Sequence, residues 1–137
     1  MTFKSLRDFE SVLPQVWSRE TSSNPDRWNP CEPSKWQCDV TSMAVRDCFE
    51  RVYPNVTLLR EKGKFSDGLW RAHYFNMFFG ERIDLAPFYS GEVVRTGRSR
   101  ELCPGQIRLM FADLNFARRY RIFREALWEI EKKLYSS

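Results

Sequence analysis

Residues 70–85 of the chain, WRAHYFNMFFGERIDL, decide the fold. Aromatic residues dominate 70–78, a composition typical of a strand, and 81–85 is a shorter strand candidate. Gly80 marks a tight connection between these two segments. We therefore predict that they pair as an antiparallel hairpin.

This hairpin carries the single histidine of the chain, His73. A two-residue turn at Phe79-Gly80 pairs Phe75 with Asp84. His73 then lies diagonally from Asp84 on the same sheet face, about 7–8 Å away along the backbone, within reach of a side-chain hydrogen bond. Asn76 has the opposite parity to His73, so it would need a bulge to contact the imidazole. Asp84 is therefore the predicted partner that orients the imidazole.

Cys38 stands at the predicted start of a helix, directly after a proline-rich loop over residues 22–35. Unpaired N–H groups and the positive end of the helix dipole favour a thiolate there. The same N–H groups, helped by the Gln37 amide, could stabilise an oxyanion during acyl transfer. Asp39 acts in the opposite direction, because a neighbouring carboxylate raises the pKa of a thiol.

Each of these residues also has a plain structural interpretation. A lone Cys at a helix start is usually a small buried hydrophobe, and a lone His in an aromatic strand is usually structural. Asp84 beside Arg82 is also typical of surface charge. The combination of a thiol, the single imidazole and a carboxylate nevertheless matches a nucleophile–base–orienter triad. The candidate catalytic residues are Cys38, His73, Asp84 and Gln37.

Hydrophobic periodicity predicts the rest of the fold. Besides the hairpin, it predicts helices over 3–17 and 39–52, a strand over 56–60, a loop over 86–105, a short strand over 107–111 and a long C-terminal helix. The apolar stripe of that last helix runs from Phe116 to Leu134, with Asp113 as its N-cap. These elements predict an α+β fold in which a small antiparallel sheet packs with the Cys38 helix and the C-terminal helix.

The composition indicates one domain spanning residues 1–137, with 42% hydrophobic and 15% aromatic residues to build a core. It excludes a disordered tail, a collagen-like fibre and a disulfide-stapled scaffold. No apolar run is long enough to span a membrane, and residues 1–20 lack a signal-peptide pattern, so we expect a cytoplasmic protein without a membrane partner. The four cysteines form no CxxC pair and their spacing does not match common zinc sites. We therefore expect free thiols, no metal and no other cofactor.

Positive charge is concentrated in one part of the chain. Between Arg95 and Arg124 there are eight arginines against only Glu101 and Asp113, although the whole chain has a net charge of +4. Such a stretch would attract nucleic acid or an acidic partner, and a solvated helix face is the commoner explanation.

Several short segments carry a family resemblance: WSRETS (17–22), NP (29–30), QC (37–38), VT (40–41), HYFN (73–76) and IDL (83–85). In these segments the chain resembles the YunG-like proteins, over roughly residues 16–88. It departs from that pattern at Trp36, where a glycine usually precedes Gln-Cys, at Asp39, where a small residue is usual, and at Phe75, where a tryptophan is common. The resemblance implies a papain-like or transglutaminase-like arrangement, with a Cys-bearing helix packed on a sheet that carries His and Asp.

The function expected from these observations is thiol-dependent acyl chemistry. Cys38 would attack an amide or ester carbonyl, with His73 as base and then acid and Asp84 holding the ring. Transfer of the acyl group to water, as in a peptidase, amidase or deamidase, and transfer to an amine are both left open. The alternative is a non-enzymatic binding module whose basic surface between Arg95 and Arg124 takes nucleic acid or an acidic partner. A thiol redox protein fits less well, because no resolving cysteine lies close in sequence.

Overall fold

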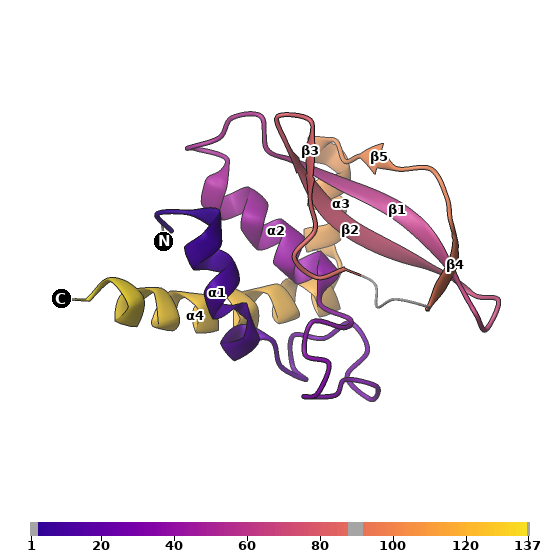
Figure 1. The fold of residues 1–137 in the computed structure, drawn as a ribbon, viewed down its shortest axis with the longest axis horizontal. Helices are drawn as coiled ribbons and strands as arrows, with labels where there is room; N and C mark the ends of the chain where they lie inside the picture. The colour runs from indigo at the N-terminus through magenta and orange to yellow at the C-terminus, as the bar shows by residue number, and fades with distance from the viewer. Residues whose placement is uncertain (1–2, 88–91, 137) are drawn as a thin grey trace.

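The computed structural model describes residues 3–87 and 92–136 and shows a layer of helices beside one antiparallel sheet (Figure 1). The elements in chain order are α1 (Leu6–Val16), α2 (Cys38–Phe49), β1 (Thr57–Phe65), β2 (Trp70–Phe78), β3 (Glu81–Ile83), β4 (Val93–Thr96), β5 (Arg100–Glu101), α3 (Pro104–Ala112) and α4 (Leu114–Tyr135). The predicted α+β class is therefore confirmed.

The hairpin of β2 and β3 has the predicted register. Asn76 lies opposite Ile83, so that continuing the pairing by one residue places Asp84 where the sequence predicts it. The turn residues Phe79 and Gly80 have φ angles of 50° and 80°, as the two-residue turns that match the twist of paired strands require. The ladder ends at Ile83, earlier than the predicted end of the second strand at residue 85.

The sheet is more extensive than the sequence predicts. Its order is β3-β2-β1-β4, and β5 also pairs with β1. β1 runs past the predicted end at residue 60 because β2 and β4 give its later residues partners. The predicted loop over 86–105 contains β4 and β5, while its residues 88–91 lie outside the described part of the chain.

The short strand predicted over 107–111 is wrong, because these residues belong to helix α3. Pro104 stands at the start of this helix, where a missing N–H costs nothing. Cys103 and Gln106 form a capping box that begins the helix. A five-residue apolar run does not distinguish a strand from part of a helix, and these start signals decide for the helix.

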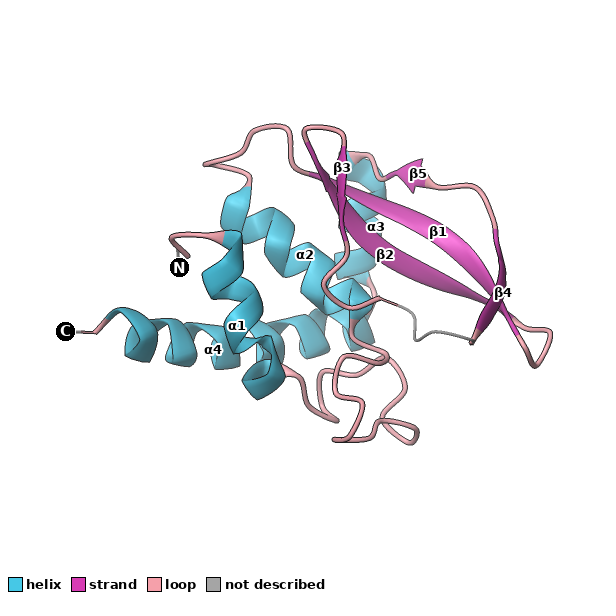
Figure 2. Ribbon diagram, viewed as in Figure 1, coloured by secondary structure: helices cyan, strands magenta, loops and turns pink. Residues whose placement is uncertain are grey.

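The helices α1, α2 and α4 pack on one another and, through α2, on the sheet (Figure 2). Phe116, Phe123 and Leu127 of the predicted α4 stripe are buried, whereas Leu134 at its end is exposed. Asp113 caps α4 as predicted, since its carboxylate accepts from main-chain N–H groups of the first turn. None of the helices in the described residues is long and apolar enough to cross a membrane.

Candidate functional site

His73 and Asp84 meet across the β2–β3 hairpin. Nε2 of His73 lies 2.6 Å from Oδ2 of Asp84, a short hydrogen bond between an imidazole and a carboxylate. His73 is only 1% exposed, and its ring stacks against Phe75 with the ring centres 6.2 Å apart. The orientation of the imidazole is therefore fixed on one side by a carboxylate and on one face by an aromatic ring.

Arg82 supports this pair from the neighbouring strand. Its Nη2 lies 3.1 Å from Oδ2 of Asp84 and 2.7 Å from Oε1 of Glu61, and its guanidinium lies 3.8 Å from the ring centre of Phe75. Arg82 therefore fixes the carboxylate that holds His73. The sequence pattern indicates only surface charge at Arg82 and Asp84, because nothing local shows that Glu61 faces Arg82 from β1.

Cys38 begins α2 and lines the same cavity as His73, with a volume of about 380 Å³. Trp36, Phe65 and Arg71 form part of the wall of this cavity. A narrower crevice is lined by Cys38 together with Asp84. The structure thus places Cys38 at one cavity together with His73 and at a narrow gap together with Asp84.

The thiol of Cys38 is held in its neutral form. Burial raises its pKa to about 12, and the charges of Asp39 and Asp84 add to this effect. Hydrogen bonds from the main-chain N–H groups of Tyr74 and of Cys38 itself lower the pKa, but by less. The expectation that the start of the helix favours the thiolate is therefore corrected, because burial outweighs the helix terminus.

The charge of Asp39 is partly offset by Arg119 of α4. The two terminal nitrogens of Arg119 lie 3.1 Å and 2.7 Å from the two carboxylate oxygens, and Nη1 also donates to the carbonyl of Thr21. Both Asp39 and Arg119 are buried. This ion pair connects the long C-terminal helix to the first turn of the helix that carries the thiol.

Gln37 is fully buried and is engaged elsewhere. Its Nε2 donates to the carbonyl of Ser18 at 2.8 Å, and its Oε1 accepts from the hydroxyl of Thr21 at 2.8 Å. Gln37 is not among the residues that line the two cavities at Cys38. These contacts make it a residue that fixes the preceding loop to the start of α2. The expected oxyanion contact from its amide has no support in this geometry.

Asn76, which has the opposite strand parity to His73, has a structural role. Its Nδ2 donates to the carbonyls of Ser42 and Thr57, at 3.0 Å and 3.2 Å. These two bonds fasten α2 and β1 to β2. Of Asn76 and Asp84, Asp84 is the residue that bonds the imidazole.

Two further observations concern the thiols and metal binding. All four cysteines are free thiols, as predicted. Over residues 3–87 and 92–136, no cluster of three or more His, Cys, Asp or Glu side chains could hold a metal ion.

The basic stretch between Arg95 and Arg124 is not one surface. Arg119 is used inside the fold against Asp39, and Arg124 lies 3.2 Å from Asp47. The remaining arginines divide between the sheet edge (Arg95, Arg98, Arg100) and the helices α3 and α4 (Arg108, Arg118, Arg121).

Comparison with known proteins gives one family. A family model described as YunG protein matches residues 5–129. The chain belongs to the YunG family. No significant match was found among curated proteins or among solved structures. The matched region reaches from α1 into α4, so it covers more of the chain than the segments over 16–88.

One departure from the YunG pattern has a structural consequence. Trp36, where the family resemblance leads us to expect a glycine, has a φ of 67°, in the left-handed region that favours glycine. Its ring stacks on Phe65, with the centres 6.4 Å apart, and lies 5.7 Å from the guanidinium of Arg71. Its buried indole N–H has no hydrogen-bond partner in the described structure. In this YunG protein, aromatic packing at the cavity wall therefore accompanies a strained backbone next to the thiol.

Proposed function

We propose that this protein performs thiol-dependent acyl chemistry, with Cys38 as nucleophile and His73 as its base. The observation that carries the proposal is the 2.6 Å bond from Nε2 of His73 to Asp84, at a cavity that Cys38 also lines. A buried imidazole held by a carboxylate, at a cavity that a thiol also lines, is an arrangement suited to nucleophilic acyl transfer.

The neutral thiol determines how the first step would proceed. Because burial keeps the pKa of Cys38 near 12, the resting site holds a thiol and not a thiolate. With its Nε2 hydrogen directed at Asp84, His73 would accept the thiol proton at Nδ1 while the sulfur attacks a carbonyl carbon. The charge of Asp84 stabilises the imidazolium that results.

The remaining steps return the proton. The tetrahedral intermediate expels an amine or an alcohol, which takes the proton from His73, and a thioester with Cys38 remains. Water or an amine then attacks the thioester, with His73 again removing the proton of the attacking group and returning one to the sulfur. Hydrolysis and transfer to an amine share all of these steps, and only the acceptor differs.

Main-chain groups are the best candidates to stabilise the oxyanion. The main-chain groups of Tyr74 and of Cys38 itself lower the pKa of the thiol, so they would lie near the carbonyl that the sulfur attacks. We assign them this role in place of the Gln37 amide, whose contacts hold it against Ser18 and Thr21.

The more specific fold assignment, papain-like or transglutaminase-like, is part of the same proposal. A helix that begins at the thiol and packs on a strand bearing the histidine supports the papain-like or transglutaminase-like arrangement that the family resemblance implies. Four free thiols fit a reducing compartment, which supports a cytoplasmic location.

The test uses p-nitrophenyl acetate as a generic acyl donor. Cys31 and Cys103 are exposed thiols, so both are first replaced by serine to remove background acylation. We expect acetylation of Cys38, detected by peptide mass spectrometry, with release of nitrophenol. His73→Gln should abolish this acetylation while leaving the far-ultraviolet circular dichroism unchanged. Equal acetylation of Cys38 in folded His73→Gln and parent proteins would refute the proposal.

A further inference from the structure

A second hollow on the sheet is bordered by positive charge. It has a volume of about 580 Å³ and lies apart from the Cys38 cavity, with no residue in common. Its lining residues are Arg60, Glu61, Lys62, Trp70, Gly97, Arg98 and Arg100. We name this feature the basic hollow.

Strand pairing places like charges directly opposite one another at the basic hollow and beside it. Arg60 of β1 pairs with Arg100 of β5, and Lys64 of β1 pairs with Arg95 of β4. Like charges at directly opposed positions destabilise a sheet. Two such pairs on one strand therefore cost folding free energy unless an anion binds between them.

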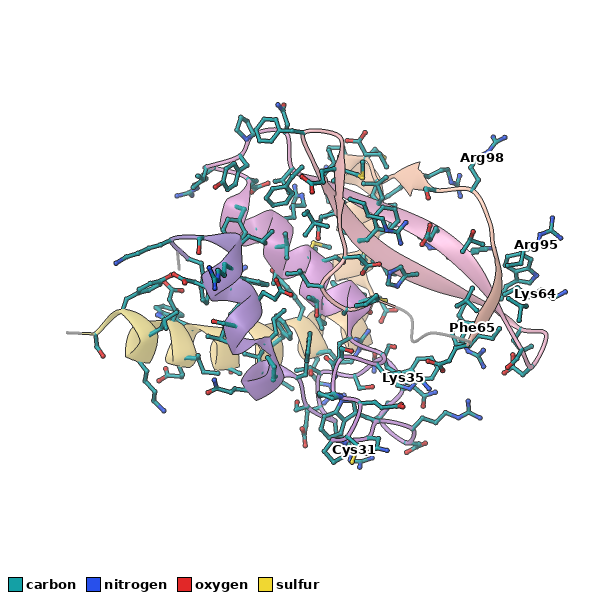
Figure 3. All side chains as sticks on the ribbon, in the orientation of Figure 1. Cys31, Lys35, Lys64, Phe65, Arg95 and Arg98 are labelled. Carbon is teal, nitrogen blue, oxygen red and sulfur yellow. The ribbon has the colours of Figure 1, made fainter. Side chains whose placement is uncertain are left out.

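No carboxylate within the described residues neutralises this charge. Lys62, Lys64, Arg95, Arg98 and Arg100 form no ion pair in that part of the chain. Figure 3 shows Lys64 and Arg95 at the end of the sheet and Arg98 nearer β5, all three projecting away from the helices.

The two acidic residues nearby do not change this balance. Glu61 is only 6% exposed, and its oxygens are bound by Arg82 and by the hydroxyl of Ser99. Glu101 pairs with Leu59, one position from the Arg60 pair, and so faces the opposite side of the sheet.

An aromatic platform stands among the cations. Trp70 is 44% exposed and is paired with Lys64, so its indole shares a sheet face with that ammonium group. An exposed indole interleaved with unpaired lysines and arginines is the composition of surfaces that bind single strands, where bases stack on the ring and phosphates contact the cations. An acidic peptide would use the cations but would not require the indole.

We propose that the basic hollow and its flanking pair Lys64 and Arg95 bind single-stranded nucleic acid, with a base on Trp70 and phosphates on the surrounding cations. This site is independent of the chemistry proposed at Cys38. It differs from the basic surface expected between Arg95 and Arg124, because half of its charge comes from β1 and none from α3 or α4.

The test measures fluorescence anisotropy of a labelled single-stranded RNA of about 12 nucleotides. The test variant carries Arg95→Ser, Arg98→Ser and Arg100→Ser. The matched control carries Arg108→Ser, Arg118→Ser and Arg121→Ser, which removes the same charge from exposed positions of α3 and α4.

We expect the test variant to bind at least about 10-fold more weakly and the control to change by less than about twofold. The magnitude of the slope of log affinity against log salt should decrease by about 2 in the test variant, because each of its three lost phosphate contacts contributes about 0.7. Trp70→Leu should weaken binding at least about fivefold with an unchanged salt slope, because stacking does not release counterions.

Stability separates a binding site from a structural one. Because the test variant relieves both like-charge pairs, its urea midpoint should equal or exceed that of the parent. Should the test variant fail to fold, Arg98→Ser alone, which lies between β4 and β5, gives the affinity readout.

Three outcomes would overturn the assignment. These are no RNA binding by the parent at about 50 mM salt, equal losses in the test and control variants, and tighter binding of a polyglutamate peptide than of the RNA. Aggregation of the test variant without RNA binding by the parent would assign the cations to protection of the sheet edge instead.

Discussion

Arg119 holds both carboxylate oxygens of Asp39, the residue that follows the candidate nucleophile, at 3.1 Å and 2.7 Å. The two residues are eighty positions apart, and the contact is buried. It places a positive charge from α4 against the negative charge that raises the pKa of Cys38. The C-terminal helix therefore takes part in the electrostatics of the site at the start of α2.

Replacing Arg119 should make Cys38 less reactive. In Arg119→Gln the charge of Asp39 is no longer offset, so the pKa of the thiol rises further and alkylation by iodoacetamide slows. Removing one partner of a buried ion pair also destabilises the protein, by about 3 kcal/mol or more. The double variant Asp39→Asn with Arg119→Gln removes both charges and should restore the alkylation rate to that of the parent or above. Arg118→Gln, at an exposed neighbouring position, is the control. A folded Arg119→Gln protein with an unchanged rate would contradict this prediction.

Asp84→Asn should lower the rate of Cys38 acetylation by at least about 100-fold, because the amide no longer stabilises an imidazolium at His73. The control is Asp67→Asn, which removes a carboxylate that binds Arg71 outside the His73 contact. Both rates follow from nitrophenol release in the background without Cys31 and Cys103. A loss of less than about threefold for Asp84→Asn would remove Asp84 from the triad.

Glu61 should contribute stability that depends on pH. Burial raises its pKa, but the hydrogen bond and charge of Arg82 more than compensate, so the pKa of Glu61 lies below the ordinary value of 4.5. The folded state therefore binds this proton less readily than the unfolded state, and the stabilisation is present above about pH 4.5 and is lost as the pH falls through the folded pKa. Urea midpoints measured from pH 7 to pH 3 should fall less steeply for Glu61→Gln than for the parent. The exposed Glu81→Gln variant should follow the parent curve, and identical curves for all three proteins would show that Glu61 contributes no such dependence.

Trp36→Gly should be more stable than Trp36→Ala by about 1 kcal/mol. Both variants lose the packing on Phe65 and Arg71, so their difference isolates the backbone. A φ of 67° costs an alanine about 1–2 kcal/mol and costs glycine almost nothing. Urea denaturation of the pair measures this difference, and an alanine variant at least as stable as the glycine variant would show that residue 36 does not hold the left-handed conformation.

The hairpin could be predicted from sequence because its information is local. The spacing of His73 and Asp84 around the Phe79-Gly80 turn fixes the register, and the structure has that register. The N-cap at Asp113 was predictable for the same reason, since capping involves residues within one turn.

What could not be predicted depends on contacts between distant segments. β4 and β5 are short and become strands only because β1 offers them partners. The neutral state of the Cys38 thiol depends on burial by the whole fold, which the local helix signal does not report. The buried contacts of Gln37 and Arg119 likewise join segments that no local pattern connects.

The most direct test of the central claim is the rate of Cys38 alkylation by iodoacetamide as a function of pH, in the parent and in His73→Gln. Mass spectrometry of the Cys38 peptide separates this thiol from the other three. If His73 is the base, the parent should react much faster than His73→Gln at neutral pH, and His73→Gln should react readily only as the pH approaches the thiol pKa of about 12. Superimposable profiles for two folded proteins would mean that the imidazole takes no proton from the sulfur, and the account of Cys38 as an activated nucleophile would be wrong.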